Sequence, residues 1–422
     1  MQKKILIALV HSTSNAGDLA LLEMSILMLK KYFKEVDIII SANYPTEALL
    51  HNLGHEIVAS PLSIIGKTQN MPLPFQLYRL MNGWCESQKI TWKHSHWSRL
   101  ISAYNQADLV VAIPGNLFFS TGKYGWPYPA QAFSVSLAHR FNKPFYVLPQ
   151  SIGPFKRKWE KKILRNIYSP ARQIFLRDNR SLQFAREIGL PMERVSYAPD
   201  PAFALEPENT ENAIETLVRY GWLPNKPSVG VTVIPPMVRS LNINSINRYY
   251  KTLALTLENF SNSEDSQIVF FNQVTGPSAI EDDRLPTRVI YTQIKSNLPQ
   301  KNILLIEDQL TPNMLKACYG HMDLFIASRL HSGIFSLGMK VPTIFIGYLS
   351  KTIGVLEMLN LQEFGLELEN VDEYNLINLV LNTWNSKAEI RHKLEYLIPL
   401  VKQDTMKPAE IIYRDFTCGS CP

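Results

Sequence analysis

Short apolar runs alternate with amphipathic stretches along most of the chain. The first run covers residues 5–10, and the stretch after it places apolar side chains at helical spacing up to Phe33. A strand, a helix and a further strand in this order indicate a parallel sheet with right-handed crossovers. The pattern therefore predicts an α/β fold. Further apolar runs of strand length occupy residues 36–41, 107–113, 144–148, 173–176, 229–233, 267–272, 303–306, 324–327 and 341–346.

The length of the chain and a break in this pattern indicate two domains. The 422 residues exceed what one ordinary core accommodates. Pro224 and Pro227 bound a hinge-like stretch, after which the strand–helix pattern starts again. Two doubly wound, Rossmann-like α/β domains facing a cleft make the GT-B-like arrangement of many glycosyl-transferring enzymes. The predicted boundaries are residues 1–205 for an N-terminal domain, 206–227 for a linker, 228–400 for a C-terminal domain and 401–422 for a polar tail.

The stretch that begins at residue 324 concentrates candidate chemistry. Residues 324–327 predict a buried strand, and Ser328 stands at the N-cap position of the short helix that follows. Arg329 and His331 therefore fall between the carboxyl end of a strand and a helix N-terminus. Open α/β sheets bind ligands at this edge, and the unpaired N–H groups of a helix start attract anions. Lys351 occupies the equivalent position one unit later, so we expect both cations to face one crevice.

Polar loops also follow predicted strands of the N-terminal domain. The loop after residues 5–10 contains Asn15, Gly17 and Asp18. It is not a GxGxxG dinucleotide fingerprint, but its small residues allow close backbone approach by a ligand. An Asx turn and an N-cap would explain Asn15 and Asp18 without a functional role. Three more polar residues stand at or beyond the ends of other strands of this domain: Asn116, Gln150 and Arg177.

Charge and composition narrow the class of partner. The formal net charge is +6 and the sequence pI is about 8.9, which suits anionic small molecules or an anionic membrane surface. The charge is too weak and too scattered to indicate nucleic acid. The sequence contains no run of the ~18 apolar residues that a transmembrane helix needs. The start resembles a signal peptide, but its apolar core is short and runs into a polar loop, so a strand is the preferred interpretation.

The cysteines and histidines point to neither a disulfide scaffold nor a metal site. Four cysteines in a chain of this size favour a reducing compartment. Cys418 and Cys421 form a CxxC pair at the end of the sequence, where we expect a disordered tail rather than a redox or metal site. His94 and His96 are not spaced as metal ligands on a helix. No metal requirement is therefore expected.

Two segments have surface character. Residues 60–104 hold Trp84, Trp92 and Trp97, which either contact a sugar or a membrane or are core aromatics of an irregular segment; we favour the second interpretation. The basic stretch 156–167 has apolar residues on one helical face. It either lies on anionic lipid or is a solvated helix over the core, and the solvated helix is the commoner case.

Several motifs, in this order, carry a resemblance to a known family. They are residues 15–18 (NAGD), 108–110 with 114–116, 150–154 (QSIGP), 177–178 with Ser181, 199–203 (PDPAF) and 328–331 (SRLH) with 341–342 and Lys351. In order and spacing, the chain resembles the polysaccharide pyruvyl transferase family over nearly its whole length. The resemblance implies transfer of a pyruvyl group from phosphoenolpyruvate to two hydroxyls of a sugar, with formation of a cyclic ketal and release of phosphate.

The resemblance also implies roles for the candidate residues. Arg329 is the first choice for binding the anionic donor, because a guanidinium recognises carboxylate and phosphate through two parallel hydrogen bonds. His331 is the candidate proton donor to the methylene carbon; a helix-start histidine bonded to backbone is the alternative. The C-terminal domain is the expected donor side and the N-terminal domain the expected acceptor side, although one assigned donor residue, Arg177, belongs to the N-terminal domain. Donor binding adds Arg177, Lys351 and Ser328, and acceptor binding comprises Asn15, Gly17, Asp18, Asn116 and Gln150.

The expected partners follow from this assignment. Phosphoenolpyruvate is the donor substrate and no other cofactor is expected. The acceptor is a sugar or glycan, with a lipid-linked form and a peripheral membrane contact left open, and no nucleic acid is involved. We expect a cytoplasmic enzyme, with the inner face of the membrane as an alternative location. Two other functions remain open: a nucleotide-sugar glycosyltransferase on the same fold, and a non-catalytic binding scaffold.

Overall fold

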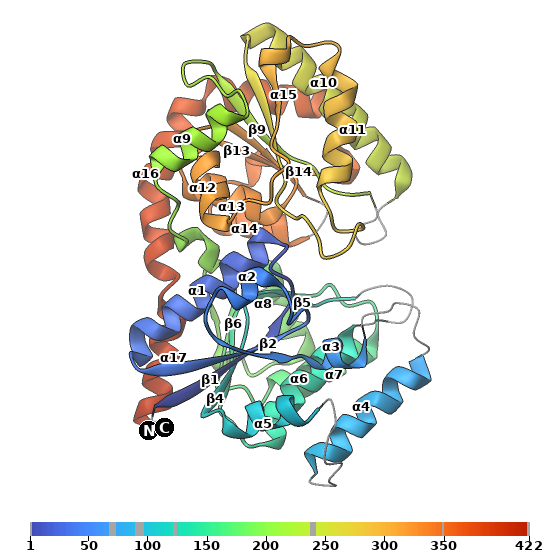
Figure 1. Cartoon of the computed structure of the whole chain (residues 1–422), viewed down its shortest axis with the longest axis vertical. Coiled ribbons are helices and arrows are strands. Elements are labelled where there is room, and N and C mark those ends of the chain that lie inside the picture. Colours follow the sequence, from blue (N-terminus) through green and yellow to red (C-terminus); the bar gives the residue numbers. More distant parts are fainter. Residues whose placement is uncertain are drawn as a thin grey trace. The chain divides into compact units, whose positions relative to one another are not determined.

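The computed structural model describes residues 2–66, 73–88, 97–120, 125, 127–236, 242–347 and 350–419. It divides the chain into two compact units, and each contains one parallel sheet with helices packed on it (Figure 1). The predicted α/β class with two Rossmann-like sheets is confirmed. Unit 1 comprises Met1–Thr13, Leu21–Pro201 and Asp404–Pro422, and unit 2 comprises Ser14–Ala20 and Ala202–Gln403.

The sheet of unit 1 runs in the order β3-β2-β1-β4-β6-β7-β8, with β5 paired to β6 beside this path. Its paired strands are parallel. The last six residues of β1 are all buried, as expected for a strand covered on both faces. The strands are β1 (Lys3–Val10), β2 (Val36–Ala42), β3 (Glu56–Ala59), β4 (Leu109–Ala112), β5 (Gly115–Phe118), β6 (Phe145–Ile152), β7 (Gln173–Leu176) and β8 (Val195–Tyr197).

Helices connect and cover these strands (Figure 1). Helices α3, α4, α5 and α7 contact the central helix α6 or one another. The helices of unit 1 are α1 (Ala16–Phe33, with its first turn in unit 2), α2 (Ala48–His51), α3 (Pro61–Ile65), α4 (Leu73–Ser87), α5 (Ser98–Gln106), α6 (Tyr128–Arg140), α7 (Lys158–Tyr168), α8 (Asn179–Ile188) and α17 (Lys407–Cys418).

The sheet of unit 2 has the order β11-β10-β9-β12-β13-β14. This is the order 3-2-1-4-5-6 of the doubly wound fold, whose ligand site lies at the carboxyl edge where the order reverses. Here that point lies between β9 and β12. The strands are β9 (Ser228–Thr232), β10 (Gln267–Phe271), β11 (Ile303–Leu305), β12 (Leu324–Ala327), β13 (Thr343–Gly347) and β14 (Gly365–Glu367).

Two groups of helices accompany this sheet. Helix α10 contacts α11 and α15, and helix α12 contacts α9 and α13; Figure 1 shows the two groups on opposite sides of the strands. The helices are α9 (Thr210–Arg219), α10 (Ile243–Glu264), α11 (Arg284–Lys295), α12 (Pro312–Tyr319), α13 (Leu330–Gly338), α14 (Ser350–Met358), α15 (Glu373–Asn385) and α16 (Lys387–Asp404).

The structure differs from the predicted boundaries in three places. The predicted linker 206–227 contains α9, whose Ala213 and Leu217 are fully buried. Residues 14–20 belong to unit 2 instead of the N-terminal domain. The predicted tail forms α17 in unit 1, where the Tyr146 hydroxyl donates to Asp415 over 2.6 Å. The tail was misjudged because its charged residues hide the helical spacing of a few buried apolar ones; Cys421 lies outside the described residues.

Lys316 is a fully buried cation within unit 2. Its ammonium donates to the carbonyls of Ala202, Phe203 and Leu205 over 3.2, 2.8 and 2.7 Å. These contacts attach the first turn after residue 201 to α12. Hydrogen bonds of a charged donor are stronger than neutral ones, and removing a buried partner leaves its acceptors unsatisfied.

We expect Lys316→Met to lower the melting temperature by roughly 5 °C or more, because three buried carbonyls would lose their donor at a cost of about 2–4 kcal/mol. Differential scanning calorimetry measures this. Lys251→Met, at an exposed position of α10, is the matched control and should melt within about 1 °C of the unmodified protein. Equal melting of the two variants would show that Lys316 does not hold this turn.

Candidate functional site

The carboxyl end of β12 carries the predicted anion site of unit 2. Arg329, not Ser328 as expected, is the N-cap of α13, with an extended backbone at φ −113° and ψ 135°. Ser328 is buried, and its hydroxyl shares a 2.6 Å hydrogen bond with the Tyr249 hydroxyl. Its N–H donates to Thr232 Oγ1 over 3.2 Å. Ser328 therefore joins β12 to β9 and α10, which suits a structural role better than side-chain contact with a donor.

Arg329 is held by an acidic partner that the sequence did not reveal. Its Nε and Nη2 atoms both donate to Asp283 Oδ1, over 2.9 and 2.5 Å, and Nη2 also donates to the Glu281 carbonyl over 2.8 Å. The arginine side chain is 13% exposed and the aspartate side chain is fully buried. One edge of the guanidinium is thus fixed by unit 2, so its orientation at the carboxyl edge is set before any ligand arrives.

The protonation of Asp283 controls this ion pair. Burial raises the pKa of Asp283 to about 6, and the neighbouring Arg329 opposes that rise. The backbone N–H of Val274 donates to the same carboxyl group over 3.0 Å. At pH 7 the group is ionised and paired, and as the pH falls through about 6 it takes up a proton and the ion pair is lost. The signal for Asp283 in the sequence is the acidic run 281–283 after the end of β10, but its pairing with residue 329 is not encoded locally.

The loop with Asn15 lies on the carboxyl edge of the unit 2 sheet. Ala16 N–H donates to the Gln273 carbonyl over 3.1 Å, and Asn15 forms an antiparallel bridge with Val274. Thr275 N–H in turn donates to the Ser14 carbonyl over 2.9 Å. Residues 14–16 therefore run alongside the segment that leaves β10.

The same loop contains the Asx turn that the sequence allowed. Asn15 Oδ1 accepts from the N–H groups of Gly17 and Asp18, over 3.0 and 3.4 Å. Asn15 Nδ2 donates to Asp18 Oδ2 over 3.1 Å. Both side chains remain partly exposed, so the turn organises the first residues of α1 and still presents a carboxamide and a carboxylate at the surface.

Gly17 lies directly against the imidazole of His331. A Cβ atom on Gly17 would stand 2.1 Å from His331 Nδ1 and 2.4 Å from Cγ, far inside any real contact. A side chain at this position is excluded unless the ring moves. The loop assigned to the acceptor and the histidine assigned to proton transfer, distant in the sequence, are therefore neighbours within unit 2.

The candidate residues of unit 1 have structural partners. Gln150 is fully buried, donates to the Ile113 carbonyl over 2.7 Å and accepts from the Tyr168 hydroxyl over 2.5 Å. A buried side chain with these partners fits a structural role, in which it connects β6 to neighbouring segments, better than contact with an acceptor. Asn116 lies on β5 in register with Ser151 and is partly exposed, which leaves its acceptor assignment a prediction.

Arg177 does not present an open guanidinium. It is 1% exposed, its Nη1 pairs with the buried carboxylate of Asp200, and its Nε donates to Ser151 Oγ over 3.0 Å. The expectation that it anchors the donor is not supported by this geometry, because its side chain is fully buried, whereas that of Arg329 keeps some exposure. Lys351 belongs to α14, and its side chain lies outside the described part of the structure.

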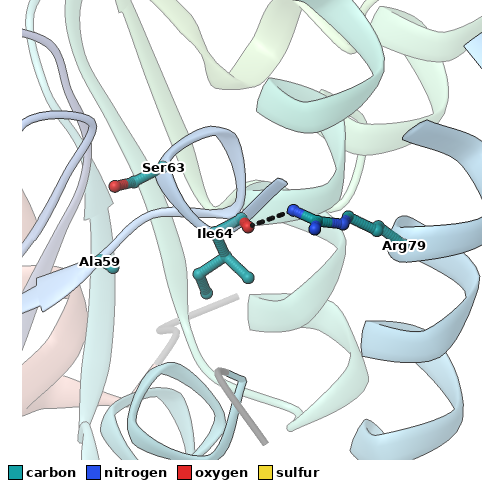
Figure 2. A pocket seen from close by; sticks show the side chains of 4 residues that line it. All are labelled: Ala59, Ser63, Ile64 and Arg79. Atoms are coloured by element: carbon teal, nitrogen blue, oxygen red, sulfur yellow. Dashed lines mark hydrogen bonds between the residues drawn. The ribbon is translucent and has the colours of Figure 1, made fainter. Parts of the chain in front are cut away.

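A cavity, a metal-binding cluster or a membrane-spanning helix would be a further functional feature. A cavity of about 260 Å³ in unit 1 is lined by Ala59, Ser63, Ile64 and Arg79 (Figure 2), and none of the predicted site residues lines it. Over the described residues, no cluster of three or more His, Cys, Asp or Glu side chains could hold a metal ion. No helix in that part of the chain is long and apolar enough to cross a membrane.

Sequence comparison finds a matching family and a similar protein of known pathway name. The sequence model of the polysaccharide pyruvyl transferase family matches residues 15–350. The chain is similar to amylovoran biosynthesis protein AmsJ of Erwinia amylovora, with 23% identity over 408 residues, 93% of this chain and 94% of that protein.

Solved structures with the same fold include GT-B proteins. A putative UDP-N-acetylglucosamine 2-epimerase from Listeria monocytogenes has a TM-score of 0.63 at 14% identity. The alignment covers 100% of this chain and 98% of the epimerase chain. Anabaena HepE in complex with UDP-glucose has a TM-score of 0.60 at 12% identity, covering 99% and 100%. At these identities the likeness shows the fold alone.

We expect Gly17→Ala to destabilise the protein by about 1–3 kcal/mol, because the new methyl group overlaps the His331 ring. In a His331→Ala background the same change should be neutral or stabilising, since alanine favours a helix start over glycine. Thermal unfolding of the four members of this double-mutant cycle measures the difference. An equal effect of Gly17→Ala in both backgrounds would mean that the loop and the ring are not in contact.

Proposed function

Since the chain belongs to the polysaccharide pyruvyl transferase family, we propose that it transfers a pyruvyl group from phosphoenolpyruvate to two hydroxyls of a sugar. Family membership makes it a transferase with a role in polysaccharide biosynthesis; the donor and the ketal product are our proposal. The observation that carries it is the contact of the loop at Gly17 with His331 at the end of β12. This contact supports the proposal because it makes neighbours of the candidate acceptor loop and the candidate proton donor within unit 2.

The reaction as proposed has three steps. Protonation of the methylene carbon gives an oxocarbenium ion, and a first sugar hydroxyl adds to it and loses its proton. Cleavage of the bond between this carbon and the phosphate oxygen then releases phosphate and regenerates an oxocarbenium ion. A second hydroxyl adds to this ion and closes the ketal. One hydroxyl proton replaces the proton given to carbon and the other leaves with phosphate, so the reaction has no net redox change and the proposal includes no cofactor.

Arg329 is the proposed anchor of the donor. Phosphoenolpyruvate is a compact anion, and Arg329 lies at the switch point of the sheet, beside a helix N-terminus that favours negative charge. Asp283 and the Glu281 carbonyl hold one edge of its guanidinium, so the ordering of a long side chain is largely complete before binding. Lys351 remains a proposed second cation.

His331 is the proposed proton donor to carbon. It stands two residues after Arg329 in the first turn of α13 and is partly exposed. A donor bound at Arg329 would have its methylene group within reach of an imidazole here. The nearby carboxamide of Asn15 and carboxylate of Asp18 are polar groups suited to hydroxyls of a sugar, which supports an acceptor approaching along the same loop.

The relative AmsJ supports the acceptor class. Its name assigns it to biosynthesis of amylovoran, and by analogy we propose a sugar of a polysaccharide or of its precursor as acceptor here. A nucleotide-sugar glycosyltransferase would use the same fold, so the donor must be tested directly.

Donor identity is tested by thermal shift. Phosphoenolpyruvate at a concentration of ~100 Kd should raise the melting temperature by roughly 5 °C, and UDP-glucose should raise it far less. Arg329→Lys should lose the shift, because an ammonium cannot bond Asp283 and a ligand through two parallel N–H groups. Arg288→Lys, at an exposed position of unit 2, should keep it. A shift with UDP-glucose alone would replace this proposal by the glycosyltransferase, and a shift retained by Arg329→Lys would move the anchor to another cation.

Proton transfer is tested at His331. His331→Gln keeps a hydrogen-bonding side chain without a titrating group, so phosphoenolpyruvate should still bind while turnover falls by ~10²–10⁴-fold. Calorimetry with the donor measures binding, and phosphate release with a panel of sugar acceptors measures turnover. Unchanged phosphate release would assign the proton to another group. Loss of donor binding would make His331 an anchor rather than an acid.

A further inference from the structure

Helix α4 presents apolar side chains to the outside of unit 1. Leu80 and Gly83 are buried, and Gly83 lies against the indole of Trp97. Five large side chains of the same helix are exposed: Phe75 by 45%, Leu77 by 50%, Tyr78 by 54%, Met81 by 58% and Trp84 by 43%.

The spacing of these residues makes a continuous surface. At about 100° per residue, Leu77, Met81 and Trp84 lie within roughly 60° of one another, and Tyr78 follows beside them. Arg79 and Gly83 lie on the opposite side of the helix, and Leu80 lies at the edge of the exposed side, about 40° from Trp84. A surface helix normally turns polar residues to water, and clustered exposed apolar groups mark an interaction site. We call these four residues the α4 face.

Defined contacts set the orientation of the α4 face. Arg79 Nη1 donates to the carbonyls of Ile64 and Ile65 at the end of α3, over 3.2 and 2.8 Å, and Figure 2 shows its side chain reaching from α4 to Ile64. Trp84 also makes an edge contact with Phe133 of α6 at 6.5 Å. The helix is therefore attached through Arg79 and Gly83 and, at one edge of the α4 face, through Trp84, while Leu77, Tyr78 and Met81 remain directed outward.

One arginine contacts the end of α4 in the structure, and basic residues predominate in the sequence around this helix. Arg140 Nη2 donates to Gln88 directly after the helix, over 2.7 Å, and the exposed Arg99 stands two residues after Trp97. In sequence, residues 61–106 contain five Lys or Arg residues and one acidic residue, Glu86. An apolar face with basic neighbours complements a surface that has an apolar interior covered by a layer of anionic groups.

We propose that the α4 face docks on an anionic lipid bilayer. A helix of 15 residues is roughly 22 Å long, too short to span a bilayer of ~30 Å, so it would lie in the interface. Tyr78 and Trp84 suit this depth because their rings are apolar with a polar edge. Anionic headgroups would attract Arg99 and Arg140.

A dimer through the α4 face and membrane contact through helix α7 both fit the structure less well. A second copy of the chain would place the same surface against itself in a two-fold dimer, and the cations around α4 would then face like charges. The basic helix α7, which the sequence suggested for lipid, has its apolar residues Leu164 and Ile167 buried, and Trp159 is its one exposed large apolar side chain. It therefore offers a smaller apolar surface to a membrane than α4 does. The proposal concerns attachment, and it does not depend on the donor of the reaction.

The experiment compares full-length variants in vesicle sedimentation. The unmodified protein should bind vesicles of phosphatidylcholine with phosphatidylglycerol, bind pure phosphatidylcholine less, and release at high salt. Leu77→Gln with Met81→Gln should weaken binding by ~10-fold or more, because two apolar side chains no longer enter the interface. Glutamine keeps helix propensity, so melting and the phosphoenolpyruvate-dependent shift should be unchanged, which separates this test from that of the function.

A matched control distinguishes docking through the α4 face from nonspecific adsorption through any exposed apolar side chain. Leu285→Gln with Val289→Gln removes two apolar groups of similar exposure, 53% and 56%, from α11 of unit 2, and should bind vesicles like the unmodified protein. The proposal is overturned if the unmodified protein does not bind anionic vesicles, or if both double variants bind equally. It is also overturned if sedimentation velocity shows a dimer that the α4 variant alone breaks, since a second copy would then cover the face.

Discussion

The contact between the backbone at Gly17 and the imidazole of His331 is the constraint on which the rest of the site depends. A side chain at position 17 would stand 2.1 Å from the ring, so the loop reaches the end of β12 only because glycine has none. Bonds of Ala16 and Thr275 to the opposite backbone hold the loop there. The contact brings the loop assigned to the acceptor and the histidine assigned to proton transfer together at one edge of the unit 2 sheet.

A buried aspartate sets the direction of the Arg329 side chain. Burying a guanidinium without a partner costs free energy. The Asp283 carboxylate is that partner for Arg329, and its hydrogen bonds also fix the direction of the guanidinium. The same pairing in unit 1 has the opposite outcome. Arg177 and Asp200 are both fully buried and bonded within a network that includes Ser151, so that pair contributes to the structure of unit 1.

The sequence predicted features that depend on local pattern and missed those that depend on distant contacts. Apolar runs located β1, β2, β4, β6, β7 and β9 to β13. They did not locate β3, β5, β8 and β14, each of which has at most two buried residues. The position of Arg329 and His331 at the end of a strand follows directly from residues 324–331. The pairing of Asp283 with Arg329, the contact of residue 17 with residue 331 and the burial of Arg177 were not predictable, because each joins segments that no local periodicity relates.

A crystal structure of the protein with phosphoenolpyruvate bound tests the central claim most directly. The account predicts the donor at the carboxyl edge of the unit 2 sheet, with an anionic group on Arg329, the Arg329–Asp283 pair intact and the methylene carbon facing His331. Donor density beside Arg177 at the edge of the unit 1 sheet, or density in unit 2 that leaves Arg329 and His331 without contact, would contradict it.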